Sequence, residues 1–263
     1  MIKLGCCLPA PVGAEEQKKL KAVRKAGFDY VEYGLRALTE LSERELEQVL
    51  SVTRETGLPV RAVNVFLPGT VRVAGPDADL GQARAYLEKA FPIAKAFGVQ
   101  VIVFGSGGSR GIPEGFSKEK AQEQLAEFLR LVEEFCARFD IVIAIESLRR
   151  EECNMVNTVL EGLELAKKTD RPHIRLLADY YHMQCMDESV ESICEAKDYL
   201  VHTHIASREG RRYPLPEKRA EHLPFFAALK AAGYEGGVSI EGESPDFMGE
   251  IETSFRLLDE LRR

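Results

Sequence analysis

Four side chains that can bind a metal ion follow four short apolar segments in the second half of the chain. They are Glu146 in IVIAIES, Asp179 in IRLLADYYH, His204 in LVHTHIAS and Glu241 in GGVSIEGE. A carboxylate is costly to bury without a partner, so acids at the ends of buried segments need a cation or a hydrogen-bond donor. Oxygen and nitrogen ligands that converge from successive segments would form a site for one divalent cation.

The apolar segments alternate with helical patterns, with a repeat of about 30 residues. The strand candidates are short and rich in Val and Ile, as buried parallel strands are. They cover residues 2–6, 30–35, 60–66, 100–106, 141–147, 174–180, 200–206 and 237–243, and helical patterns cover residues 14–27, 42–57, 82–98, 118–139, 157–169, 222–233 and 250–263. This alternation predicts a single α/β domain over residues 1–263, a (β/α)8 TIM barrel.

One helix boundary can be predicted in detail. Ser42 is the candidate N-cap of the segment SERELEQVLSVTRETG, and Glu45 stands three residues later, as a capping box requires. Gly57 is expected to end this helix.

In such a barrel, functional side chains lie at the C-terminal ends of the strands. The residues expected near those ends include the four candidate ligands and also Glu32, Asn64 and Ser106. Agreement between a predicted barrel and polar residues at one rim supports the fold and the site together.

Composition and charge exclude several classes of protein. The chain has 263 residues, 45% hydrophobic and 29% charged, as in a soluble globular protein, and its net charge of -7 argues against nucleic-acid binding. No apolar run approaches the ~20 residues of a membrane span, and the N-terminus lacks a signal-peptide pattern. The six cysteines form no CxxC pair, so we expect free thiols in a cytoplasmic protein. No glycine-rich nucleotide motif follows the first strand.

The motifs together resemble the xylose-isomerase-like barrels, and most closely the ketose 3-epimerases of the tagatose and psicose type and related sugar-phosphate isomerases. They are IAIES, LLADYYH, HTHIASREGR and SIEGE, in this order over residues 140 to 245. Each motif alone is weak, but four in order on strands five to eight are specific. The resemblance implies an isomerase acting on a small sugar, and we also expect a homo-oligomer, a dimer or a tetramer.

The resemblance also implies roles for individual residues. Glu146, Asp179, His204 and Glu241 would bind one divalent cation, with Mn²⁺ as the first candidate and Mg²⁺, Co²⁺ or Zn²⁺ as alternatives. Glu146 and Glu241 would also be the acid–base pair, and the substrate-binding residues would be Glu152, His182 and Arg211. Arg211 lies seven residues after His204, one more than in the sugar epimerases, and the loop RRYPLPEKRAEH lacks their glycine. The substrate therefore stays open.

The expected chemistry is proton transfer next to a carbonyl group. A cation would act as a Lewis acid on the carbonyl and the adjacent hydroxyl, and two opposed carboxylates would remove and return the proton through an enediolate. Opposed bases give epimerisation, and transfer between adjacent carbons gives isomerisation. Either glutamate alone could equally pair with an arginine, and Asp179 alone could form a turn; the set of four favours a cation site.

Three other functions remain as alternatives. A metal-dependent lyase, a dehydratase of a cyclic keto-polyol, would use similar ligands. A phosphodiesterase of the endonuclease IV type shares this barrel but needs three zinc ions and many histidines, whereas this chain has five. A barrel that binds without catalysis is disfavoured by the two glutamates.

Several further residues have a second interpretation. Ser106, Gly107 and Arg110 in GSGGSRGIPEG, residues 105–115, could bind an anion such as phosphate, or this could be a flexible loop. We expect His202 to pack behind the ligands. His173 and His222 lie outside the strand ends and are expected to be exposed; Cys6 or Cys7 would face the pocket without a base partner.

Overall fold

A computed structural model describes all 263 residues and contains a closed barrel of eight parallel strands. The strands are β1 (Lys3–Leu8), β2 (Tyr30–Gly34), β3 (Val60–Asn64), β4 (Val101–Phe104), β5 (Val142–Glu146), β6 (Ile174–Asp179), β7 (Leu200–Ile205) and β8 (Gly237–Ile240). They follow one another around the barrel in sequence order, and β8 pairs with β1. The predicted (β/α)8 fold is confirmed.

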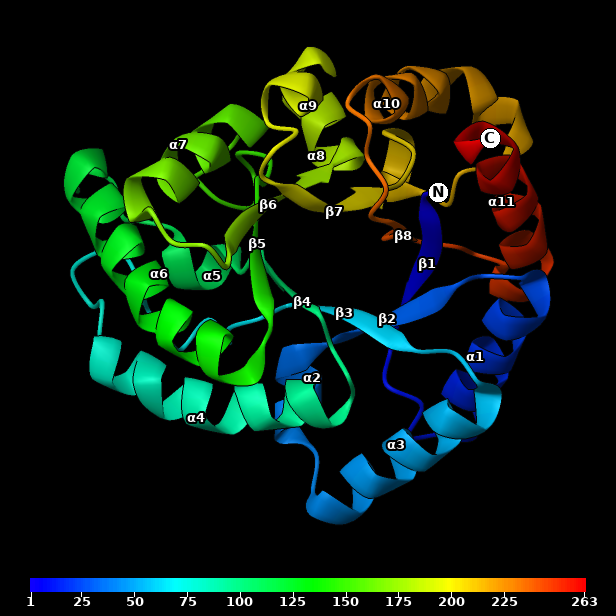
Figure 1. Cartoon of the computed structure of the whole chain (residues 1–263), viewed down its shortest axis with the longest axis horizontal. Helices are drawn as coiled ribbons and strands as arrows, with labels where there is room; N and C mark the ends of the chain where they lie inside the picture. The colour runs from blue at the N-terminus through cyan, green and yellow to red at the C-terminus, as the bar shows by residue number, and fades with distance from the viewer.

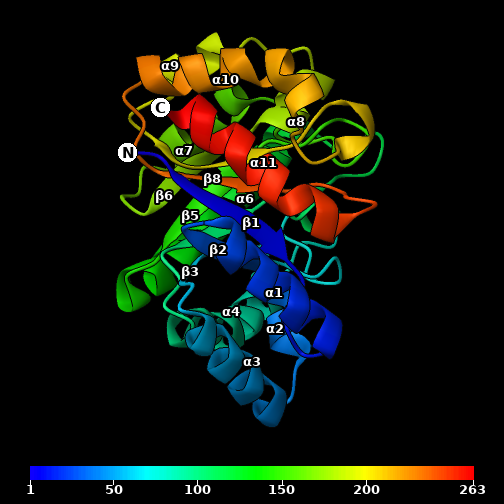
Figure 2. The same ribbon diagram turned by 90° about the vertical axis from the view of Figure 1, so that its right-hand side faces the viewer.

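Helices surround the strands on the outside (Figure 1 and Figure 2). The long helices are α1 (Ala14–Ala26), α3 (Glu43–Thr56), α4 (Leu80–Ala96), α6 (Lys118–Phe139), α7 (Val159–Thr169), α10 (Arg219–Ala231) and α11 (Phe247–Arg262). Shorter ones are α2 (Leu35–Glu40), α5 (Gly107–Arg110), α8 (Tyr180–Cys185), α9 (Glu191–Glu195), η1 (Glu209–Arg211) and η2 (Pro216–Lys218). None of the helices combines the length and apolar character that crossing a membrane requires.

The capping prediction for α3 is confirmed. The backbone N–H of Glu45 donates to the Ser42 hydroxyl, and the Glu45 carboxylate accepts from the backbone N–H of Ser42 at 2.9 Å. Gly57 follows the helix with a φ of 69°, in the left-handed region that glycine adopts without strain.

The segment between β6 and β7 differs from the expectation. The sequence showed no helical pattern there, but the structure contains the two short helices α8 and α9. Their six and five residues are too few for a 3.6-residue periodicity to become visible. The side chain of Asp179 starts α8 by accepting hydrogen bonds from the backbone N–H groups of Tyr181 and His182.

The two ends of the chain lie side by side and close the ring of helices (Figure 2). Arg262, near the end of α11, donates to the carbonyl oxygen of Ile2 at 2.9 Å and to the carboxylate of Asp29 at 2.7 Å. Between strands and helices the core is apolar, with Phe66 packed edge-on against Phe91 and Phe104.

Strand register decides which side chains lie at the same height at the C-terminal end of the barrel. A register shift between Leu176 and Leu177 places Asp179 of β6 opposite His204 of β7, and His204 lies opposite Ser239 of β8. Glu146 ends β5, Asp179 ends β6, and Glu241 directly follows β8. The four candidate ligands are therefore at the same end of the barrel.

Candidate active site

Glu146, Asp179, His204 and Glu241 converge on one point at the C-terminal ends of β5 to β8. Their nearest ligand atoms all lie within 4.8 Å of one another. Nδ1 of His204 is central: it lies 3.4 Å from Oε1 of Glu146, 3.3 Å from Oε2 of Glu241 and 3.9 Å from Oδ2 of Asp179. The structure thus brings together the four residues that the sequence singled out.

The donor atoms of this group fit a divalent cation. Nδ1 of His204 and Oε1 of Glu146 are buried and have no hydrogen-bond partner. Buried polar atoms are normally paired, so unpaired ones that face each other require an explanation. Three carboxylates and one imidazole form a ligand set for a hard or borderline metal ion, which would pair these atoms.

Asp179 has one oxygen for the fold and one for the site. Its Oδ1 accepts from the backbone N–H groups of Tyr181 at 2.7 Å and His182 at 3.3 Å, as the N-cap of α8. This fixes the rotation of the carboxylate, and Oδ2 points toward His204. The two interpretations of Asp179, turn former and ligand, are compatible.

Behind the cluster, Glu32 of β2 holds both histidines of β7. Its Oε1 lies 3.0 Å from Nε2 of His204, and its Oε2 lies 2.9 Å from Nε2 of His202. Ser239 donates to the same Oε2 at 2.8 Å. All four side chains are completely buried. His202 therefore packs behind the ligands, in the position expected for it.

The three residues expected to bind substrate border the cluster. Arg211 contacts Oε2 of Glu241 and lies 3.3 Å from Oδ2 of Asp179 and 3.9 Å from Oε1 of Glu152. Nδ1 of His182 accepts from the backbone N–H of Arg149 at 3.2 Å, so its Nε2 carries the proton. This buried Nε2 has no partner and lies 3.7 Å from Asp179 and 4.0 Å from Glu152.

The surroundings shift the pKa values of Glu146 and Glu241 in opposite directions. Burial raises the pKa of Glu146, and the charges of Glu241 and Asp179 raise it further. Burial also acts to raise the pKa of Glu241. His204 and Arg211 outweigh burial there and lower this pKa to about 2. Burial also lowers the pKa of His182 and so favours its neutral form.

Two of the expectations are wrong. Arg110 does not face an anion site: it is fully buried and donates to the backbone carbonyl oxygens of Phe104 at 2.8 Å and Glu146 at 2.6 Å. The hydroxyl of Ser106 accepts from the backbone N–H of Leu67. The loop after β4 thus supports the rim, and Gly107 belongs to the short helix α5. His222 is buried rather than exposed, with Nε2 3.1 Å from the hydroxyl of Ser207.

Some residues at the site had no assigned role. Asn64 donates to Oε1 of Glu241 at 2.6 Å, and Glu32 supports His204. The sequence marks both only as polar residues near strand ends. Gly105 gives room to Glu146, since a Cβ at position 105 would lie 2.1 Å from its Oε2. Cys7 lies within 4.8 Å of His204 and Glu241, and Cys6 instead contacts the hydroxyl of Tyr213 at 3.4 Å.

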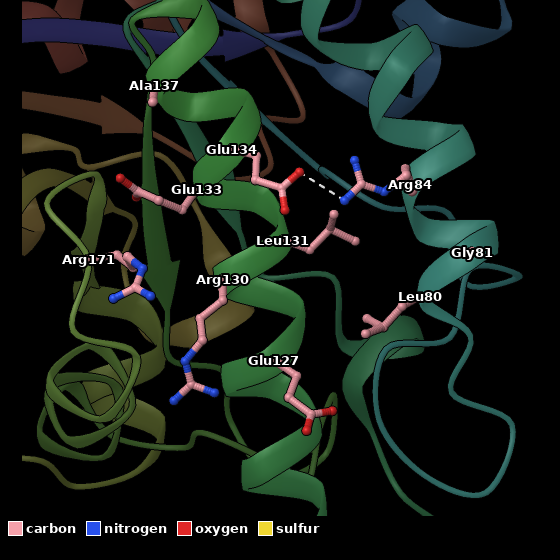
Figure 3. A pocket seen from close by; sticks show the side chains of 10 residues that line it. All are labelled: Leu80, Gly81, Arg84, Glu127, Arg130, Leu131, Glu133, Glu134, Ala137 and Arg171. Carbon is pink, nitrogen blue, oxygen red and sulfur yellow. Dashed lines mark hydrogen bonds and ion pairs between the residues drawn. The ribbon is translucent and has the colours of Figure 1, made fainter.

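A separate groove of about 730 Å³ lies on the outer helix layer (Figure 3). It lies between α4 and α6, where Arg84 and Glu134 form an ion pair of 2.8 Å. Its charges are mixed, and none of its lining residues belongs to the carboxylate cluster.

Comparison with known proteins places the chain in a family. The model of the xylose isomerase-like TIM barrel family matches residues 20–261. The chain belongs to this family. Within the xylose isomerase-like barrels, it is 24% identical over 231 residues to 3-dehydro-D-guloside 4-epimerase of Escherichia coli (strain K12), covering 86% of each chain. It is 28% identical over 240 residues to L-ribulose 3-epimerase of Methylomonas sp. (strain DH-1), covering 89% of this chain and 81% of the relative.

The three-dimensional similarity extends over the whole chain. The crystal structure of D-allulose 3-epimerase from Methylomonas sp. in complex with D-allulose superposes with a TM-score of 0.86 and 21% identity. The match covers 98% of this chain and 96% of that one, and it shows the shared fold. The relatives matched by sequence are named epimerases and isomerases, which indicates that this xylose isomerase-like barrel is an isomerase.

Proposed function

We propose that the protein is a metal-dependent sugar epimerase or isomerase that acts on a ketose or a related polyol-derived ketone. The observation that carries this proposal is the placement of two glutamates around one nitrogen atom. Glu146 from β5 and Glu241 after β8 lie 3.4 Å and 3.3 Å from Nδ1 of His204. β6 and β7 stand between them in the barrel, so the two carboxylates approach from different sides.

Glu146, Asp179, His204 and Glu241 would hold the cation, for which we propose Mn²⁺. When bound, a divalent ion supplies Lewis acidity to the substrate's carbonyl and the adjacent hydroxyl, which makes the neighbouring C–H bond more acidic. The unpaired Nδ1 of His204 and Oε1 of Glu146 support this proposal.

The two glutamates would move the proton. One carboxylate removes the proton from the carbon next to the carbonyl, and the other returns a proton from the opposite side, which inverts that carbon. His204 and Arg211 both lie against Glu241 and favour its ionised form. Asn64 fixes the other oxygen of Glu241.

Three side chains would orient the sugar. The Nε2–H of His182 is a free donor for a hydroxyl group, and the Glu152 carboxylate is an acceptor beside it. Arg211 can donate to a second hydroxyl or to the carbonyl. The names of the relatives, L-ribulose 3-epimerase among them, support a ketose as the substrate class.

Exchange of solvent deuterium into a panel of ketopentoses and ketohexoses tests this function. We expect Mn²⁺-loaded enzyme to incorporate deuterium next to the carbonyl and to form the epimer. Glu146→Gln and Glu241→Gln should each lower turnover by about 10² to 10⁴, because each removes one acid–base group. Glu151→Gln, on the exposed loop, is the matched control.

Three results would contradict parts of the proposal. Near-parental turnover in either Gln variant, with native circular dichroism, would exclude a two-base mechanism. Loss of water without epimer formation would show a dehydratase instead. Transfer of the label between adjacent carbons would select isomerisation over epimerisation.

A further inference from the structure

We propose that Glu32 is the residue that positions His204 for metal binding, an inference that rests on the metal site of the proposed function. Glu32 lies on β2, across the barrel from the strands that carry the ligands, and it is not itself part of the group of four. Among the four candidate ligands, it contacts His204.

The contacts of Glu32 determine which nitrogen of His204 carries the proton. An ionised carboxylate can only accept hydrogen bonds, so Nε2 of His204, 3.0 Å from Oε1, must be the donor. Nδ1 is then the ring nitrogen left for a metal ion, and it faces the oxygens of Glu146 and Glu241. It is therefore directed at the place where a cation would bind.

The carboxylate is itself held in place. Its Oε2 accepts from Nε2 of His202 at 2.9 Å and from the hydroxyl of Ser239 at 2.8 Å. Tyr30 lies 2.8 Å from the same hydroxyl of Ser239. Two donors, His202 on β7 and Ser239 on β8, thus fix the acid on β2, and Glu32 in turn orients the His204 ring.

A purely structural role is the alternative. Burying a carboxylate is expensive, and an apolar side chain could fill the barrel at lower cost. Carboxylates that accept from metal-binding histidines raise metal affinity by about 10- to 100-fold. The two roles differ in whether metal affinity depends on the Oε1 contact in particular.

The Mn²⁺ dissociation constant, measured from the electron paramagnetic resonance signal of free Mn²⁺, distinguishes the two roles. Glu32→Gln keeps the side-chain volume but removes the charge, and we expect metal binding to weaken by about 10- to 100-fold. Ser239→Ala removes one of the donors to Oε2 but keeps the Oε1 contact with His204, so it should weaken binding clearly less than Glu32→Gln does. Urea unfolding in the presence of a chelator checks that both variants fold.

A second measurement needs no variant. In Zn²⁺-loaded protein labelled with ¹⁵N, long-range ¹H–¹⁵N spectra should show the His204 proton on Nε2 and a metal-shifted Nδ1. A proton on Nδ1 would overturn the proposal, even if Glu32→Gln cannot be folded.

The outcomes separate this inference from the proposed function. A parent protein that binds Mn²⁺ and turns over ketose, with Glu32→Gln binding equally tightly, would refute only the role of Glu32. Equal losses in Glu32→Gln and Ser239→Ala would show a general network effect and also refute it. A parent protein that binds no divalent cation would remove both proposals.

Discussion

At the scale of the residue, side chains of the site divide their polar atoms between the fold and the reaction centre. Oδ1 of Asp179 caps α8 while Oδ2 faces the cluster. Nε2 of His204 donates to Glu32 while Nδ1 faces the carboxylates. One atom anchored by the protein fixes the direction of the other, which is what a preorganised site requires.

Glu146 depends on the space that Gly105 leaves. A Cβ at position 105 would lie 2.1 Å from Oε2 of Glu146, so Gly105→Ala must displace this carboxylate. We expect turnover to fall by about 100-fold or more, since a misplacement of about 1 Å has effects of this size. Steady-state kinetics measures the loss of turnover, and circular dichroism checks that the variant is folded.

Gly69→Ala is the matched control, because its new Cβ would make only ordinary contacts with Gly108. Near-parental activity of Gly105→Ala would mean that the position of Glu146 in the structure is not the catalytic one.

At the scale of the element, the short helix α5 connects two strand ends through Arg110. The guanidinium donates to the carbonyl oxygens of Phe104, at the end of β4, and Glu146, at the end of β5. Each carbonyl group belongs to the last residue of its strand. Arg110 thus supplies a buried donor to two backbone groups at the rim.

Arg110→Ala should therefore reduce stability rather than phosphate binding. Two buried carbonyl oxygens would lose their donor and a cavity would form, at a cost of about 3 kcal/mol or more. Urea denaturation measures this loss, with Arg150→Ala on the exposed loop as a control that should change little. Competitive inhibition of the parent by inorganic phosphate, lost in Arg110→Ala, would restore an anion site here.

At the scale of the whole molecule, the candidate metal site joins four neighbouring strands, β5 to β8. A cation bound there stabilises the folded chain over the unfolded one. At free Mn²⁺ 100 times its dissociation constant, we expect a gain of about 2.7 kcal/mol in the free energy of unfolding. Denaturation with Mn²⁺ and with chelator measures the gain.

Asp179→Asn and His204→Ala should lose most of this gain. If both variants are stabilised by Mn²⁺ as much as the parent, the ion binds elsewhere and the ligand assignment fails.

His222 should make global stability depend on pH. It lies at the start of α10, buried against Ser207 and the ring of Tyr180, and burial lowers its pKa from 6.5 to about 4, against a smaller raising effect of Glu221. The unfolded chain therefore binds a proton that the folded chain does not. The contribution of neutral His222 to the free energy of unfolding, up to about 3 kcal/mol, is therefore lost as the pH falls from 6.5 to 4.

The urea midpoint, measured between pH 7 and 4, checks this dependence by comparison of the parent with His222→Gln. The variant should lose less stability than the parent over this range. Parallel pH profiles would show that His222 does not contribute.

The barrel and the four candidate ligands could be predicted from the sequence because both depend on local patterns. Short β-branched runs indicate buried parallel strands, and the C-terminal ends of such strands meet at one rim. Acids and a histidine that follow four successive runs must then lie near each other, without any knowledge of packing. The capping box of α3 is local in the same sense, since three residues of spacing define it.

Only the tertiary structure decided the contacts of Glu32, Arg110 and His222. Glu32 contacts His202, which lies 170 positions later in the chain, and strand register brings the two side chains together inside the barrel. The glycine-rich loop made Arg110 a candidate anion-binding residue, but in the structure two rim carbonyl oxygens hold its guanidinium. Partners of buried polar groups depend on which strands and loops meet across the barrel, and sequence periodicity carries no information about those encounters.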